Sequence, residues 1–327
     1  MSDGLRVGVV GCGGLGRRQA SIVNELAGVN LVGVADVNPQ SAKQLADELN
    51  VGLATGDYRQ LLDAGLDAVF VVTPTFTHRE IVLAAADAGL HVFCEKPMAT
   101  SVADCEEMIA ATEAAGVQLM TGYVLRFYPA YAEMKKMAED GRLGDVRLAW
   151  TVRMGGRPPA GVGDWRREKE KVGGLYSASC HQMDLLLWMA GPATQVTGHV
   201  NWGSFDDTDT EDSIIISWWA ENGAVCSLHS SQLYPVGGSE FGLGGTRGSV
   251  KLIDSNSILF ADHEGDKQTI EFEAVDGLVA ELSHFLDCVR TGRPNSIPGK
   301  AGRDSLEVFE AAYLSAEKRQ PVKLPIT

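Results

Sequence analysis

The sequence predicts an α/β protein with an N-terminal doubly wound parallel sheet and a C-terminal α/β domain whose large sheet is mainly antiparallel and open-faced. Three observations lead to this prediction. Short apolar runs alternate with helical patterns up to residue 122, longer β-branched and aromatic runs follow residue 144, and two helical stretches close the chain. Alternating strands and helices are typical of a parallel sheet, whereas consecutive strands are typical of an antiparallel one.

The expected strands of the first domain are apolar throughout, which is the pattern of strands buried on both faces. They are residues 5–10, 30–36, 67–72, 90–94 and 117–122. The segments between these strands have apolar residues at helical spacing, and each of them ends on glycine or asparagine. These helices are expected at residues 16–28, 39–50, 78–89 and 101–116. The first domain therefore covers residues 1–122.

The second domain, residues 123–327, begins its strands after residue 144. The expected strands are residues 145–154, 194–203, 211–220, 223–232 and 248–254. The closing helices are expected at residues 278–292 and 302–319, and the last of them is a candidate to pack back on the first domain. A chain of 327 residues is long enough for two domains of ordinary size.

The composition excludes several classes of partner. A formal net charge of −15 argues against nucleic acid and against an anionic membrane surface, because both require a basic face. The six cysteines contain no CxxC pair, so neither a metal site nor a disulfide framework is expected. Without a signal-peptide pattern or an apolar run long enough to span a membrane, we expect a cytoplasmic protein.

A glycine-rich turn follows the first strand directly. In "GCGGLG" the residues Gly11, Gly13 and Gly16 have GxGxxG spacing, with Gly14 and Leu15 inside the turn. Such glycines permit a tight turn and close approach of the backbone to a pyrophosphate, and the helix that follows offers free N–H groups to the anion. The turn predicts a dinucleotide site.

Asp36 ends the second strand, 20 residues after Gly16. A carboxylate at this position accepts hydrogen bonds from the adenosine ribose hydroxyls and repels a 2′-phosphate, so NAD is the expected cofactor. Arg17 and Arg18 keep NADP open, since either cation would offset that repulsion.

Lys96 lies in "EKP", directly after the strand 90–94. Ligands of doubly wound sheets bind beyond the carboxyl ends of the strands, so this lysine is expected to face the ligand. A lysine there can hold the reacting oxygen as a cationic donor.

Five segments together resemble the Gfo/Idh/MocA oxidoreductases, a family named for glucose-fructose oxidoreductase and inositol dehydrogenase. They are "GVVGCGGLG", "TPTFTH", "EKP", "GYVLRFYPAY" and "GGLYSASCHQMD", and the similarity covers nearly the whole chain. The resemblance implies a Rossmann domain followed by a substrate-binding α/β domain, whose sheet face often forms a homodimer or homotetramer.

The resemblance also implies roles for particular residues. Glu95, Lys96 and Pro97 would form the family's EKP motif, with a cis bond before Pro97, and Lys96 would contact both the nicotinamide ribose and the substrate. The family's D-x-x-x-H-x-x-D segment matches "SASCHQMD", in which His181 would take the substrate's hydroxyl proton. We therefore expect Lys96 and His181 to be the catalytic residues.

This segment departs from the family pattern at its first position, where Ser177 replaces the usual carboxylate. Serine exchanges hydrogen bonds with a substrate hydroxyl, but it supplies no negative charge to raise the basicity of His181.

Further residues are expected around the cofactor and the substrate on the family pattern. The expected cofactor contacts are Thr73, Pro74, His78, Glu95, Trp165 and Arg166 in addition to the glycine turn and Asp36, and the expected substrate contacts are Tyr123, Arg126 and Ser177.

The predicted function is an NAD(P)-dependent, metal-independent dehydrogenase or reductase that acts on a secondary alcohol or ketone of a sugar, cyclitol or related polyol. Two alternatives stay open. One is a lyase or glycoside-cleaving enzyme that uses bound NAD as a transient oxidant, and the other is a non-catalytic dinucleotide-binding or scaffold protein.

Overall fold

The computed structural model describes residues 4–157 and 162–326, which form two units. Unit 1 consists of Met1–Tyr123 and Leu278–Arg303, and unit 2 of Val124–Gly277 and Asp304–Thr327. The chain therefore returns to unit 1 late in its course, with helix α9 (Gly277–Thr291) and the first residues of helix α10 (Gly299–Lys318).

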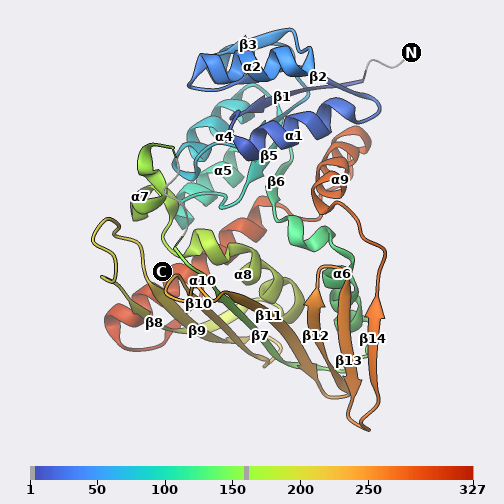
Figure 1. Cartoon of the computed structure of the whole chain (residues 1–327), viewed down its shortest axis with the longest axis vertical. Helices are drawn as coiled ribbons and strands as arrows, with labels where there is room; N and C mark the ends of the chain where they lie inside the picture. The colour runs from blue at the N-terminus through green and yellow to red at the C-terminus, as the bar shows by residue number, and fades with distance from the viewer. Residues whose placement is uncertain (1–3, 158–161, 327) are drawn as a thin grey trace. The chain divides into compact units, whose positions relative to one another are not determined.

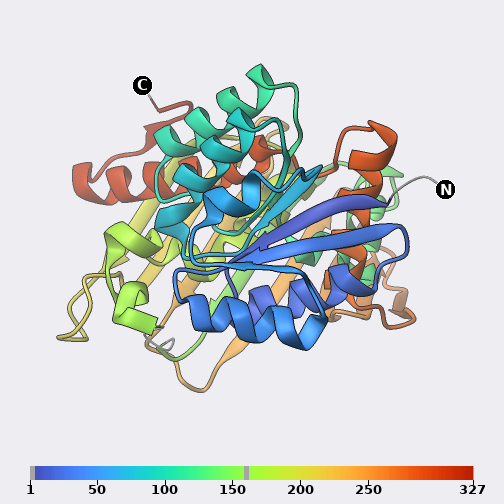
Figure 2. The ribbon, with the colours of Figure 1, turned by 90° about the horizontal axis from the view of Figure 1, so that it is seen from above.

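Unit 1 is built on a parallel sheet, in which six strands of the described residues have the order β3-β2-β1-β4-β5-β6. The strands are β1 (Leu5–Val10), β2 (Val29–Ala35), β3 (Leu53–Thr55), β4 (Ala68–Val71), β5 (His91–Glu95) and β6 (Leu119–Gly122). The connecting helices are α1 (Gly14–Glu25), α2 (Pro39–Leu49), α3 (Tyr58–Leu62), α4 (His78–Asp87) and α5 (Val102–Ala114), with the short 3₁₀ turn η1 (Thr75–Thr77) before α4. In Figure 2, α1 and α2 lie on one side of the sheet and α4 and α5 on the other. The predicted doubly wound sheet is confirmed.

Local sequence explains where these helices begin. Asn38 accepts a hydrogen bond from Gln40 N, and Pro39 follows at the first helical position of α2. Ser101 caps α5 through Asp104 N at 3.1 Å. These are the side chains that satisfy free N–H groups at helix starts.

Helices on both faces shield the central strands from solvent, and every residue of β4 is buried. Part of this core is an aromatic cluster in which the rings of Phe70, Phe93 and Phe285 lie 5.4–5.7 Å apart. Phe285 comes from α9, so the late return of the chain completes the core of unit 1.

Unit 2 is built on a mixed, mostly antiparallel sheet, in which nine strands of the described residues have the order β14-β13-β12-β11-β7-β10-β9-β8-β15. The strands are β7 (Val146–Met154), β8 (Ala193–Asn201), β9 (Ser213–Ala220), β10 (Val225–Ser231), β11 (Gly238–Gly245), β12 (Gly248–Asp254), β13 (Ser257–Asp262), β14 (Lys267–Glu271) and β15 (Val322–Lys323). Only the pairing of β7 with β10 is parallel among the strand pairs described. The predicted large, mainly antiparallel sheet is confirmed.

The helices of unit 2 gather over one face of this sheet, as Figure 1 shows for α6 (Pro129–Glu139) and α8 (Tyr176–Ala190). The remaining short helices are η2 (Val124–Phe127), η3 (Val162–Arg167) and α7 (Lys169–Val172). Strand β9 alternates accordingly: Ile214, Ile216 and Trp218 are buried, whereas Ile215 and Trp219 are exposed. This alternation is the pattern of a sheet with one face turned away from the core.

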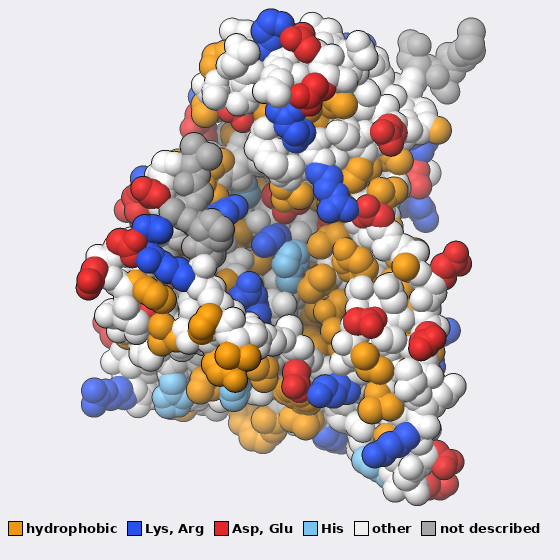
Figure 3. Space-filling model, in the orientation of Figure 1, with side chains coloured by type: hydrophobic (Ala, Val, Ile, Leu, Met, Phe, Trp, Pro, Cys, Tyr) orange, Lys and Arg blue, Asp and Glu red, His pale blue; other side chains and the backbone are white. Residues whose placement is uncertain are grey.

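On the face shown in Figure 3, the Lys and Arg side chains are interspersed with Asp and Glu side chains. None of the helices in the described part of the chain combines the length and the apolar composition needed to span a membrane.

Candidate active site

The glycine-rich turn lies between β1 and α1, where the sequence predicts it. Gly11 has φ +103°, a conformation that favours glycine, and a Cβ at Gly16 would overlap the carbonyl oxygen of Gly11. Around Gly13 and Gly14, by contrast, a Cβ would meet no described atom within 4 Å, and both residues, like Leu15, are exposed. Among the residues that the structure describes, no side chain caps α1, so the N–H groups of its first turn are available to an anion. A dinucleotide pyrophosphate fits this turn.

Asp36 lies at the end of β2 and holds the glycine turn by hydrogen bonds. Its Oδ2 accepts from Cys12 N at 2.7 Å, and its Oδ1 accepts from Asn38 N at 2.9 Å. Each carboxylate oxygen has a further lone pair, so the same group can accept from ribose hydroxyls. Arg17 forms an ion pair with Glu48 on α2, which directs its guanidinium to a carboxylate of the protein.

His78 connects two loops at the carboxyl edge of the sheet. Its Nε2 lies 2.9 Å from the carbonyl oxygen of Thr73, and its Nδ1 lies 2.9 Å from the carbonyl oxygen of Pro97. Burial lowers the pKa of His78, and the backbone hydrogen bonds to Thr73, Met98 and Pro97 oppose that shift. The ring therefore lies between the half-buried Thr73 and Pro74 loop and the segment that carries Lys96, and in its neutral form it donates its one N–H to one of these carbonyl groups.

The EKP segment places its lysine and its glutamate differently. Lys96 is half-buried after β5 and precedes a cis bond to Pro97, whereas Glu95 is buried. The Glu95 carboxylate accepts from Lys96 N at 2.9 Å and from Gln19 Nε2 at 2.6 Å. Burial raises the pKa of Glu95, and the positive charge of Lys96 opposes that shift. Within unit 1, the buried Glu95 carboxylate thus holds the backbone of Lys96 in place through this hydrogen bond.

Gln19 is a site residue that the sequence reasoning missed. It lies on α1, one turn after Gly16, and is fully buried against Glu95. A glutamine on the buried face of the glycine-turn helix was the available signal, because buried polar side chains have hydrogen-bond partners. Through this pair, the helix that follows the glycine turn is joined to the strand that ends at Lys96.

Tyr123 follows β6 and is fully buried in the structure. Its side chain packs within the core, and its predicted contact with substrate stays a prediction.

In unit 2, Ser177 and His181 lie on α8, four residues apart, and both are half-buried. This spacing places the two side chains on the same face of the helix, one turn apart. The sequence expectation that they share a helical face is met.

Arg126 and Asp184 form a buried ion pair within unit 2. Arg126 Nη2 lies 2.5 Å from Asp184 Oδ1, and Nε donates to Oδ2 at 2.8 Å. The Asp184 side chain is 2% exposed and that of Arg126 is 11% exposed. Burial raises the pKa of Asp184, and the Arg126 guanidinium opposes that shift. This bidentate pair connects η2 to α8. Whether Arg126 also contacts the substrate stays a prediction from the sequence.

Trp165 and Arg166 lie on η3, where the Arg166 guanidinium carbon is 5.2 Å from the centre of the Trp165 ring. The neighbouring Arg167 pairs with Asp207 and anchors this segment to the β8–β9 connection.

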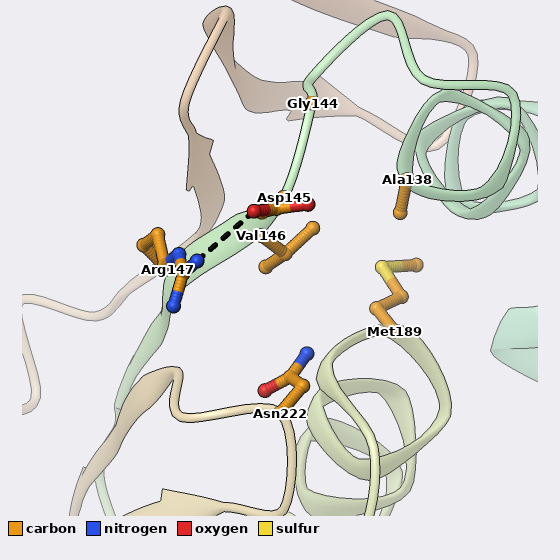
Figure 4. A pocket seen from close by; sticks show the side chains of 7 residues that line it. All are labelled: Ala138, Gly144, Asp145, Val146, Arg147, Met189 and Asn222. Carbon is orange, nitrogen blue, oxygen red and sulfur yellow. Dashed lines mark hydrogen bonds and ion pairs between the residues drawn. The ribbon is translucent and has the colours of Figure 1, made fainter.

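A cavity of about 380 Å³ lies elsewhere in unit 2 (Figure 4). It is lined by Ala138, Gly144, Asp145, Val146, Arg147, Met189 and Asn222. Met189 lies on the same helix as His181 but eight residues later, a separation of about 12 Å along the axis. The cavity therefore lies at the C-terminal end of α8, away from the candidate catalytic histidine. Within the described residues, no group of His, Cys, Asp and Glu side chains is arranged to hold a metal ion.

Comparisons with known proteins cover both units. The family model described as "Oxidoreductase family, NAD-binding Rossmann fold" matches residues 5–123, and the model described as "Oxidoreductase family, C-terminal alpha/beta domain" matches residues 135–324. The scyllo-inositol 2-dehydrogenase (NAD(+)) of Bacillus subtilis is 30% identical over 100% of this chain and 98% of its own. The myo-inositol 2-dehydrogenase of Thermotoga maritima is 28% identical over 98% of each chain.

Among solved structures, an aldose-aldose oxidoreductase from Caulobacter crescentus, complexed with glycerol, has a TM-score of 0.89 at 26% identity, covering 98% of this chain and 100% of its own. The predicted family resemblance is confirmed. The chain belongs to the Gfo/Idh/MocA family and is an NAD(P)-dependent oxidoreductase whose N-terminal unit is an NAD-binding Rossmann domain.

Proposed function

We propose that this oxidoreductase transfers hydride between NAD and a secondary alcohol or ketone of a sugar, cyclitol or related polyol. The observation that carries the proposal is the joint presence of Lys96, supported by Glu95 at the end of β5, and of His181 on α8 with Ser177 one turn before it. The relatives named as inositol dehydrogenases and as an aldose-aldose oxidoreductase support the substrate class.

Lys96 and His181 have separate tasks in this proposal. The bound nicotinamide supplies a carbon that accepts or returns hydride. Lys96 donates a hydrogen bond to the alcohol oxygen and stabilises negative charge there as the carbon loses hydride. His181 takes the hydroxyl proton, which leaves a ketone. Ser177 exchanges a hydrogen bond with a neighbouring hydroxyl of the substrate.

The cofactor proposal is NAD in preference to NADP. Asp36 accepts hydrogen bonds but offers none to a phosphate, and Arg17 is paired with Glu48. We further propose Thr73, Pro74, His78, Trp165 and Arg166 as residues that contact or shape the cofactor site, and unit 2 as the substrate-binding unit.

The test is a panel of cyclitols, aldoses and uronates, each incubated with NAD and with NADP while reduced nicotinamide is followed by absorbance. The proposal predicts NADH formation with at least one polyol. Loss of a glycosidic bond without net NADH would instead support a lyase that uses NAD as a transient oxidant. Tight NADH binding without turnover of any panel member would support a non-catalytic role.

We also propose that the protein is a homo-oligomer assembled through the open face of the nine-stranded sheet. Leu148, Val225 and Trp219 lie side by side on β7, β10 and β9, and they are 44%, 40% and 52% exposed. An apolar row of this kind is typical of a surface covered by a second copy. Light scattering tests this: a dimer or tetramer is expected, and Trp219→Asp should weaken it, whereas a 35.0 kDa particle at micromolar concentration would contradict it.

A cytoplasmic location is proposed from the cysteines. All six are buried, which is how thiols are kept in proteins of a reducing compartment. A cell-fractionation experiment that recovers the protein outside the cytoplasm would contradict this location.

A further inference from the structure

A buried carboxylate lies beneath the start of α8. Glu211 lies two residues before the first residue of β9, and its side chain is 0% exposed. Its Oε1 lies 2.5 Å from Lys169 Nζ on α7, and the same Nζ is 4.3 Å from the centre of the Tyr313 ring. Removing a carboxylate from water is costly unless the charge is paired, so the buried Glu211 depends on its ion pair with Lys169.

The second oxygen of Glu211 contacts the helix itself. Oε2 accepts from Leu175 N at 2.8 Å, and Leu175 is the N-cap residue of α8, with no side-chain cap of its own. The first N–H groups of a helix have no partner within the helix, and a negative charge near them is stabilising. Glu211 therefore caps α8 from a segment 36 residues away in the sequence.

The turn before α8 is shaped to admit this carboxylate. Gly173 and Gly174 have φ values of +81° and +70°, a conformation that favours glycine. A Cβ at Gly174 would collide with Glu211 Oε2. The backbone thus comes directly against the carboxylate, and the position of the first turn of α8 depends on it.

We propose that Glu211 is a positioning residue for the reaction: its carboxylate, held by Lys169, fixes the first turn of α8 and so sets the orientation of Ser177 and His181. This inference rests on the proposed catalytic function of His181. Ser177 lies two residues after Leu175, and His181 follows one turn later on the same face. Misplacement of a catalytic group by about 1 Å lowers turnover about 10²-fold. By fixing the first turn of α8, Glu211 therefore affects the reaction rate although it does not itself contact the substrate.

The experiment compares variants of the full chain on the best panel substrate. Glu211→Ala should lower kcat about 10- to 100-fold, while the substrate KM and the Kd of NADH change less than about 3-fold. The double variant Glu211→Gln with Lys169→Met should regain kcat to within about 3-fold of wild type, because the amide oxygen still accepts from Leu175 N and no unpaired charge is buried. Gly174→Ala, which disturbs the same turn with both charges intact, should lower kcat as Glu211→Ala does. If Glu211→Ala does not fold, Gly174→Ala carries the test.

The matched control is Glu168→Gln, because Glu168 pairs with Lys171 of the same short helix at 2.7 Å and both side chains are partly exposed. This variant should leave kcat unchanged. The inference is overturned if Glu211→Ala or Gly174→Ala lowers only the melting temperature, or if the double variant is as slow as Glu211→Ala. His181→Ala is measured in parallel: if it keeps wild-type turnover, the proposed function itself fails, whereas a slow His181→Ala beside a fast Glu211→Ala refutes only the role of Glu211.

Discussion

Removal of one partner of the Arg126–Asp184 pair should destabilise the protein strongly. The pair has two hydrogen-bonded contacts, at 2.5 and 2.8 Å, and side chains that are 11% and 2% exposed. Asp184→Asn or Arg126→Met removes the oppositely charged partner of a charge that stays buried, which costs about 3–5 kcal/mol of unfolding free energy. With a urea m value of about 2.5–3 kcal/mol/M, the unfolding midpoint should fall by about 1–2 M.

The assay is urea-induced unfolding followed by circular dichroism, with kcat and KM measured on each variant. The double variant Asp184→Leu with Arg126→Met should recover most of the lost stability, because an apolar pair leaves no charge in the interior. The control Asp47→Asn removes an exposed partner of Lys43 and should leave the midpoint unchanged. If Arg126→Met raises KM but leaves the urea unfolding midpoint unchanged, the pair does not stabilise the fold as we argue. That result would favour a substrate contact for Arg126.

Three further predictions concern the cofactor half of the site. Calorimetry should show tighter binding of NADH than of NADPH, because Asp36 opposes a 2′-phosphate; equal affinities would refute this. Gly16→Ala should abolish NADH binding measured by the same method, because its Cβ overlaps the Gly11 carbonyl oxygen, and retained affinity would contradict the described turn. His78 should remain neutral below pH 6.5, since burial lowers its pKa. The unfolded chain then takes up the proton first as the pH falls, so the stability that His78 contributes is complete above about pH 6.5 and declines below it; an NMR titration midpoint of 6.5 or higher would exclude this.

The sequence predicted the elements whose local pattern and burial agree. Strand β1 was expected at residues 5–10 and is Leu5–Val10, because an apolar run flanked by a glycine turn has few alternatives. Strand β11 (Gly238–Gly245) was not predicted, since half of its residues are glycine, which weakens the strand signal. Its tertiary partner explains it: a Cβ at Gly242 would be 2.7 Å from Trp150 Nε1, so glycine leaves room for the indole.

Site residues could be predicted where all the residues that identify them lie close together in the sequence. The glycine turn with Asp36 follows from spacing. Ser177 and His181 were identified by the family resemblance, and their spacing then placed them on one helical face. The supports of these residues were not predictable, because Gln19 meets Glu95 from 76 residues away and Glu211 meets Leu175 from 36 residues away. Such contacts depend on tertiary packing, which neither periodicity nor local spacing encodes.

The central claim is that Lys96 and His181 carry out the chemistry while the glycine turn and Asp36 bind the cofactor. The most direct measurement is the turnover of Lys96→Ala and His181→Ala on the best panel substrate, together with the Kd of NADH for each variant. We predict that turnover falls about 10²- to 10⁴-fold in each variant and that NADH affinity is nearly unchanged. Turnover within a few-fold of wild type in both variants would contradict the claim.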